Sequence, residues 1–101
     1  MIVRLVDEAE DDVRDARQWY RRQQPALANR FVAAVTSGLQ LIEAFPEAQP
    51  HIHEPLRRLL LHGFPYALYY FVDDNVIVVT GCFHTARDPS VWQERSDRYL
   101  P

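Results

Sequence analysis

Two strands and the turn between them are predicted by the twenty residues from 64 to 83, FPYALYYFVDDNVIVVTGCF. Residues 66–72 and 76–83 are rich in the aromatic and β-branched side chains that favour strands. The residues between them, Asp73, Asp74 and Asn75, are typical turn formers. Pro65 favours an extended conformation at Phe64, just before the first strand. This stretch therefore predicts an antiparallel hairpin, and other segments of the chain must supply the remaining strands of its sheet.

Outside this hairpin, two further segments have strand character. Residues 56–62 end at Gly63 and precede the hairpin, so they complete a three-strand meander. Residues 2–6 are apolar around Arg4 and predict a short N-terminal strand. Between the N-terminal half and the meander, three prolines keep about ten residues out of regular structure: Pro46, Pro50 and Pro55.

Two helices are predicted between the first strand and the prolines. About residues 8–23 place Ala9, Val13, Ala16 and Tyr20 on one stripe, with acidic residues first and arginines last, as a helix dipole favours. Pro25 then opens a second helix. Because the break is short, the two helices should form an antiparallel hairpin. The apolar face of the second helix comprises Leu27, Phe31, Ala34, Val35, Leu39 and Ile42.

The predicted fold class is α+β within a single domain, residues 1–101. An N-terminal strand joins a mainly antiparallel sheet completed by the meander, and the helical hairpin packs on one face of that sheet. We expect the opposite face to be partly open and lined by alternate side chains of the meander. The segment after His84 is polar, with Trp92 as its anchor.

Composition excludes several classes of protein. All eleven basic residues are arginine and the net charge is −3, which argues against Schiff-base chemistry and against broad affinity for nucleic acid. The apolar stretches are too short to cross a membrane, and no signal peptide is apparent. Cys82 is the only cysteine, which is typical of a reducing compartment. A cytoplasmic protein without membrane contact is expected.

Candidate chemistry centres on the end of the last strand, where His84 precedes Arg87. A histidine can move protons and an arginine can stabilise developing charge, which is the minimum required to cleave a phosphodiester. Arg57 and Arg58 point to opposite faces of their strand, so one of them could hold a phosphate or a carboxylate on the open face. The structural alternatives are a strand-end histidine, a pinned tail and edge charges that prevent aggregation.

Other candidate features are weaker. Tyrosines such as Tyr66 and Tyr70 could stack on a base or anchor a peptide, or could fill the core. His51 and His53 have only Glu54 as a nearby third ligand, so no metal site is expected. With three glycines there is no phosphate-cradling loop, and no cofactor is expected.

The order of the elements resembles the RelE/ParE superfamily of bacterial type II toxins, which includes plasmid stabilisation proteins. The resemblance covers nearly the full length. The matching stretches are DARQWY (15–20), LANRF (27–31), FPY (64–66) with Tyr69 and Tyr70, and FHTARDP (83–89) with Trp92 and Arg95.

This resemblance implies a toxin that is neutralised by a cognate antitoxin, with which it could form a hetero-oligomer. ParE-like members inhibit DNA gyrase, whereas RelE-like members cut mRNA on the ribosome. The His84–Arg87 arrangement and the absence of lysine favour the ParE-like branch. The alternatives are a RelE-like nuclease, which would use His84, Arg87 and Arg57 or Arg58, and a non-toxic relative. The expected target-binding residues are Arg58, Tyr66, Tyr70, His84, Arg87, Trp92 and Arg95.

Overall fold

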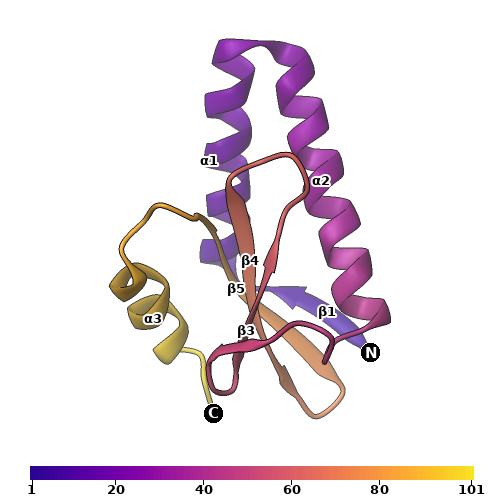
Figure 1. The fold of residues 1–101 in the computed structure, drawn as a ribbon, viewed down its shortest axis with the longest axis vertical. Coiled ribbons are helices and arrows are strands. Elements are labelled where there is room, and N and C mark those ends of the chain that lie inside the picture. Colours follow the sequence, from indigo (N-terminus) through magenta and orange to yellow (C-terminus); the bar gives the residue numbers. More distant parts are fainter.

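The computed structural model describes residues 1–101 and confirms the α+β fold (Figure 1). One sheet has the strand order β1-β5-β4-β3-β2, in which β1 is parallel to β5 and every other pair is antiparallel. The elements, in chain order, are β1 (Ile2–Leu5), α1 (Asp7–Gln23), α2 (Pro25–Ala44), β2 (His51–His53), β3 (Leu56–Leu60), β4 (Tyr66–Asp73), β5 (Val76–His84) and α3 (Pro89–Asp97).

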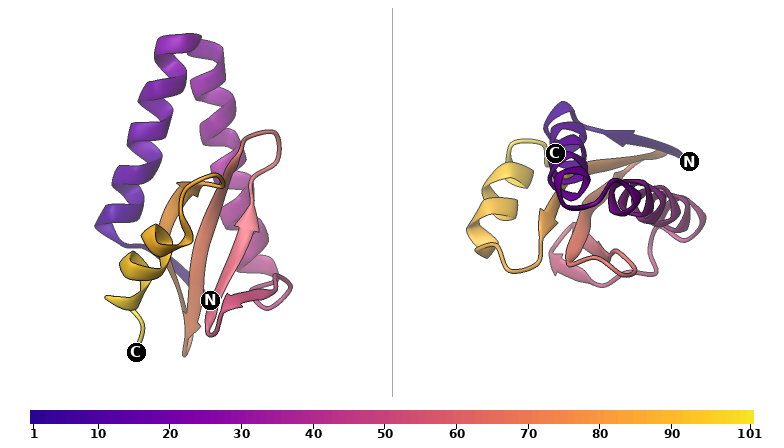
Figure 2. Two further views of the ribbon diagram at one scale, coloured as in Figure 1. Left: turned by 60° about the vertical axis from the view of Figure 1, so that its left-hand side comes forward. Right: turned by 90° about the horizontal axis from the view of Figure 1, so that it is seen from above.

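The helical hairpin of α1 and α2 packs on one face of the sheet, as predicted. The closest approach is at Gly38, where an added Cβ would lie 2.9–3.2 Å from side-chain atoms of Leu59, Leu61 and Leu68. The backbone of α2 therefore rests directly on leucines from the β3–β4 region. The end of the hairpin where α1 meets α2 projects past the sheet, so its residues are exposed on more than one side (Figure 2).

The opposite face of the sheet is not open where α3 lies. Leu68 points to α2, so its neighbour Tyr69 points to the other face. There the ring of Tyr69 stacks on Trp92 of α3, with ring centroids 5.4 Å apart. The buried hydroxyls of Thr80 and Ser96 are hydrogen-bonded at 2.8 Å. The prediction of a partly open face was wrong here, because the segment after His84 forms a helix that covers it.

The sequence contains a start signal for α3 that accounts for this helix. Asp88 is the N-cap, and its side chain accepts a hydrogen bond of 2.9 Å from the backbone N–H of Ser90. This bond lowers the pKa of Asp88. Pro89 occupies the first helical position, where its missing N–H costs nothing.

The proline-rich segment after α2 is also more ordered than predicted. It contains the short strand β2, which pairs with β3 at the edge of the sheet. The guanidinium of Arg57 donates hydrogen bonds to the backbone carbonyls of Glu47 and Gln49. The hydroxyl of Tyr70 donates to the carbonyl of Pro46 at 2.9 Å. These side chains satisfy backbone groups that the prolines leave without a strand partner.

The edge of β5 is covered by two different elements. Strand β1 pairs with residues 76–79 only. Beyond it, the backbone N–H of Cys82 donates to the Asp12 carboxylate of α1 at 3.0 Å, and the carbonyl of Thr80 accepts from Arg95 of α3 at 3.2 Å. Helices α1 and α3 thus meet at the edge of β5. No helix has the length and apolar character needed to cross a membrane.

Candidate interaction surfaces

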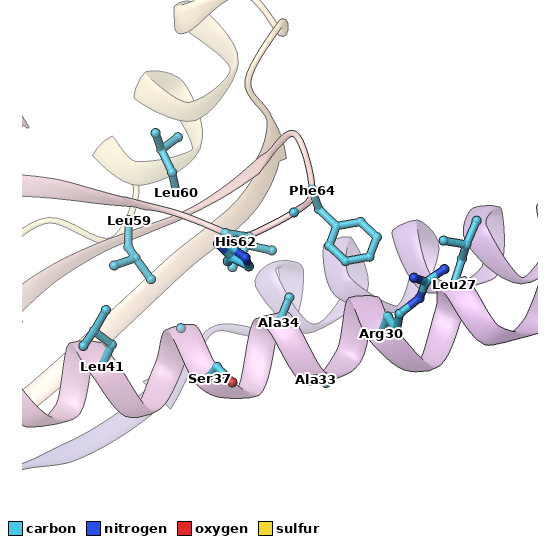
Figure 3. A pocket seen from close by; sticks show the side chains of 13 residues that line it. Leu27, Arg30, Ala33, Ala34, Ser37, Leu41, Leu59, Leu60, His62 and Phe64 are labelled. Carbon is cyan, nitrogen blue, oxygen red and sulfur yellow. The ribbon is translucent and has the colours of Figure 1, made fainter.

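A groove of about 490 Å³ runs between α2 and β3 and continues to the turn before β4; we call it the α2–β3 groove (Figure 3). The α2 side of the groove is lined by small residues, which leave space there, among them Ala34, Ser37 and Gly38. Leu59 points from β3 towards the helix, and the ring of Phe64 extends over it. The groove is therefore a mainly apolar channel of a size that suits side chains of a partner segment.

One leucine at the rim of this groove is unusually exposed for its type: Leu41 on α2 is 47% exposed. Leu60 on β3 is 60% exposed, but its side chain points away from α2, because its neighbours Leu59 and Leu61 both face Gly38 (Figure 3). Arg30 and His62 supply polar groups at the same rim. An apolar channel with a polar rim has the organisation of a protein-binding surface.

A second depression of about 620 Å³ lies between α1 and the C-terminal half of β5; we call it the α1–β5 cleft. Its walls carry Trp19, which is 50% exposed, and the more buried Tyr20 and Tyr66. His84 and Arg87 lie at its β5 end, so the structure brings these two predicted residues together with Tyr66. The rings of Tyr66 and His84 meet edge to face, with centroids 5.3 Å apart.

In the α1–β5 cleft the carboxylates have ion-pair partners, whereas two of the arginines do not. Asp12 is bound by Arg95 and by the Cys82 N–H, and Asp15 pairs with Arg14. Arg22 and Arg87 also line the cleft, are exposed and have no ion-pair partner. The cleft therefore presents free cations although the whole chain has a net charge of −3.

Cys82 lines the same cleft but is nearly inaccessible, with 3% of its surface exposed. Burial, with a smaller contribution from the nearby Asp12 charge, raises the pKa of its thiol to about 12. The thiol is therefore protonated at neutral pH and is a poor nucleophile.

Several residues predicted to bind a target have structural contacts in the free chain. Tyr70 and Trp92 are buried, with 0% and 8% of their surfaces exposed. Burial raises the pKa of the Tyr70 hydroxyl. Arg95 lies over the ring of Phe83, 4.7 Å from its centroid, and ion-pairs with α1. In this conformation, none of the three side chains is free to take a partner.

The prediction that Arg57 and Arg58 face opposite sides of the sheet agrees with the register. Arg57 pairs with Tyr70 and is engaged by carbonyls, whereas Arg58 pairs with Tyr69 on the α3 face. Burial raises the pKa of the Tyr69 hydroxyl, and the nearby Arg58 partly offsets this rise. Of the two arginines, Arg58 therefore lies on the face of the sheet that was predicted to be partly open.

Of the residues proposed for a nuclease, His84 and Arg87 line one cleft, whereas Arg57 and Arg58 do not line it. His84 pairs with Tyr66 and Arg57 pairs with Tyr70, four positions along β4. At about 3.3 Å per residue, these positions are roughly 13 Å apart along the strand. Arg57 is also held by the backbone carbonyls of Glu47 and Gln49, so in this conformation it does not join His84 and Arg87.

The sequence analysis missed Trp19 and Arg22, which it treated only as parts of an amphipathic helix. Their spacing of three residues places them side by side on one helix surface. It also missed the α2–β3 groove. The signal for the groove was the small residues of α2, which include Ala33, Ala34, Ser37 and Gly38. Metal chemistry has no candidate: no group of three or more ligating side chains is present.

The chain is thus a small α+β protein with two exposed depressions on its surface. Over residues 3–89 the sequence matches the family described as ParE toxin of type II toxin-antitoxin system, parDE. The chain therefore belongs to the ParE toxin family.

Structural comparison agrees with this assignment at the level of the fold. A chain from a chromosomal ParDE toxin-antitoxin system of P. aeruginosa superposes with a TM-score of 0.74. It is 16% identical, and the match covers 83% of this chain and 95% of that one. No curated protein sequence matches the chain.

Proposed function

We propose that this ParE-family toxin is neutralised by a cognate antitoxin whose apolar segment lies in the α2–β3 groove. The observation that carries the proposal is the exposed side chain of Leu41 at the rim of an apolar channel. Burial of an exposed apolar side chain against a partner is favourable by roughly 25 cal/mol for each Å² of apolar surface removed from water. The antitoxin is expected to supply that cover.

Introduction of a charge at the rim tests the groove. Leu41→Glu should prevent co-purification with the cognate antitoxin, because a carboxylate would be buried without a partner. Phe45→Glu is the matched control, because Phe45 is 61% exposed and does not line the groove. Both variants should fold, as circular dichroism would show. Equal antitoxin binding by the two variants would contradict the proposal.

The cellular action is inhibition of DNA gyrase. Membership of the ParE family supports this choice, since the resemblance described above implies gyrase inhibition for ParE-like members and mRNA cleavage for RelE-like members. The structure also favours binding over RNA cleavage, because Arg57 is held by two backbone carbonyls away from His84. Inhibition by binding needs no catalytic residue.

Expression without antitoxin, together with a purified supercoiling assay, tests this action. Relaxed plasmid DNA, induction of the SOS response and loss of supercoiling by purified gyrase are the expected results. If mRNA were cut while supercoiling stayed intact, the protein would be a RelE-like ribosomal nuclease and not a gyrase inhibitor. Normal growth at an expression level verified by immunoblot would identify a non-toxic relative.

A further inference from the structure

The α1–β5 cleft has the features of a binding site, and the antitoxin proposal does not use it. It is lined by residues of α1, by the first residues of β4 and by the end of β5 and the turn after it. The α2–β3 groove shares none of its lining residues. The two depressions therefore offer separate surfaces to partners.

Charge in this cleft selects for an anion. Both of its carboxylates already have internal partners: Asp12 accepts from Arg95 at 2.9 Å, and Asp15 pairs with Arg14 at 3.2 Å. Neither Arg22 nor Arg87 has an ion-pair partner, although the guanidinium of Arg87 lies over the ring of Phe83, 5.6 Å from its centroid. Unpaired arginines on opposite walls can hold an oxyanion between them with charge-assisted hydrogen bonds.

His84 adds a neutral donor beside these cations. Its Nδ1 accepts a hydrogen bond of 3.0 Å from the backbone N–H of Ala86. The ring hydrogen therefore lies on Nε2, which has no partner within the chain. Trp19 completes the site with a half-exposed ring that lies one helical turn from Arg22. Tryptophan and arginine are the residues that most often dominate binding energy in protein interfaces.

The edge of β5 indicates the shape of the ligand. The N–H of Thr85 donates to the carbonyl of Pro65, so the backbone groups of Cys82 and His84 face away from β4. Asp12 accepts the Cys82 N–H, as this alternation requires, and β1 ends its pairing at Val79. The carbonyl of His84 already accepts from the backbone N–H of Arg87 at 3.1 Å, which leaves the N–H of His84 for a main-chain hydrogen bond to an extended chain.

We propose that the α1–β5 cleft binds an extended protein segment that carries one aspartate or glutamate, its carboxylate held between Arg22 and Arg87. The inference rests on the proposed function in one respect, because the segment is assigned to the toxin's target rather than to its antitoxin. A polyanion such as single-stranded DNA fits less well. Its affinity grows with the number of phosphates neutralised, and the exposed acidic residues of the nearby first half of α1 repel it.

Binding of defined probes to the intact protein tests the cleft directly. The probes are a blocked hexapeptide of threonine and valine with one central glutamate, its glutamine counterpart, and hexathymidylate. In NMR titrations the glutamate peptide should shift the indole N–H of Trp19 and the amides near His84. The glutamine peptide should bind about tenfold more weakly, which corresponds to one lost charge-assisted hydrogen bond.

Paired arginine variants provide the matched control. Arg22→Gln with Arg87→Gln should weaken binding of the glutamate peptide about tenfold or more. Arg17→Gln with Arg21→Gln removes the same charge from exposed positions of α1 that do not line the cleft, and should leave peptide affinity within about twofold. Equal losses in the two double variants would overturn the proposal. So would tighter binding of hexathymidylate, or the absence of any shift at Trp19.

A cellular readout separates this inference from the proposed function. The Arg22/Arg87 double variant should lose growth inhibition while it still co-purifies with the antitoxin. If the parent protein fails to inhibit gyrase, the peptide titration still decides whether the cleft binds carboxylates. If a double variant that no longer binds the peptide remained toxic, the toxin's target would not bind in this cleft.

Discussion

Arg95 of α3 and Asp12 of α1 form a two-pronged ion pair, with Nη1–Oδ2 and Nη2–Oδ1 distances of 2.9 and 3.1 Å. Each side chain is only 16% exposed. Asp12 also accepts from the Cys82 N–H, and Arg95 also donates to the Thr80 carbonyl. One pair of side chains therefore joins the first and last helices to the edge of β5.

Removal of this pair should destabilise the protein. Arg95→Gln leaves the Asp12 carboxylate partly buried with one partner fewer, and we expect a loss of about 2–4 kcal/mol in urea unfolding. Arg14→Gln is the control, because its ion pairs are more than half exposed and should contribute about 0.5 kcal/mol or less. Similar midpoints for the two variants would show that the Arg95–Asp12 pair is not structural.

Truncation of the two tryptophans should destabilise the protein to very different extents. Trp92→Ala removes the ring stacked on Tyr69 and should cost about 3–5 kcal/mol of unfolding free energy. Trp19→Ala should cost about 1 kcal/mol or less, because that ring is half exposed and meets Tyr20 only at its edge. Acrylamide should quench the fluorescence of Trp19 strongly and that of Trp92 weakly. Strong quenching of Trp92 would mean that α3 does not cover the sheet in solution.

The C-terminal residues are held by a carboxylate that acid should release. The Tyr99 hydroxyl donates to Glu8 at 2.6 Å, and this bond, followed by that from Arg98, lowers the pKa of Glu8 below its ordinary value of 4.5. A lowered folded-state pKa stabilises the protein above the unfolded value, and this stabilisation is lost as the pH falls through the folded-state value. Tyr99→Phe should move the pKa of Glu8 back towards 4.5 in a carboxyl-detected NMR titration. An unchanged pKa would exclude the Tyr99 bond as its main cause.

Cys82 should resist modification until the chain unfolds. Its pKa of about 12 lies above its ordinary value of 9, so almost no thiolate exists at pH 8, and burial blocks access as well. A thiol reagent at pH 8 should react slowly with the native protein and rapidly in urea. Because the folded-state pKa is raised, stability should be full below pH 9 and should fall as the pH rises towards 12. Cys82→Ala should lack this alkaline decline, and a decline of equal size in that variant would assign it to other groups.

Much of the architecture follows from local patterns in the sequence. The hydrophobic spacing of α1 and α2, and the β-branched runs around the Asp73–Asn75 turn, predict four of the elements within a few residues, and the apolar residues 2–6 and 56–62 predict β1 and β3. The helix α3 was missed, because its apolar residues are few and its polar surface resembles a loop. Its start signal was present in the pair Asp88-Pro89, which the sequence analysis did not interpret as a cap.

The candidate site was less predictable than the fold. His84, Arg87 and Tyr66 were named from the sequence and meet in one cleft. Trp19 and Arg22 come from a helix more than sixty residues before His84, so their proximity depends on how α1 crosses the end of the sheet. The engagement of Arg57 and Arg95 is equally non-local, because their partners lie on other elements. Spacing along the chain carries no information on such contacts.

Four aromatic rings lie between the two depressions and are in mutual contact. Phe64 lines the α2–β3 groove, Tyr20 and Tyr66 line the α1–β5 cleft, and Phe31 packs between them with centroid separations of 5.3–5.4 Å. An occupant that moved Phe64 would have to move rings that form the far wall of the other site. Thermodynamic linkage would then make each ligand alter the affinity of the other by the same factor. Antitoxin and target would in that case communicate through the toxin without ever touching.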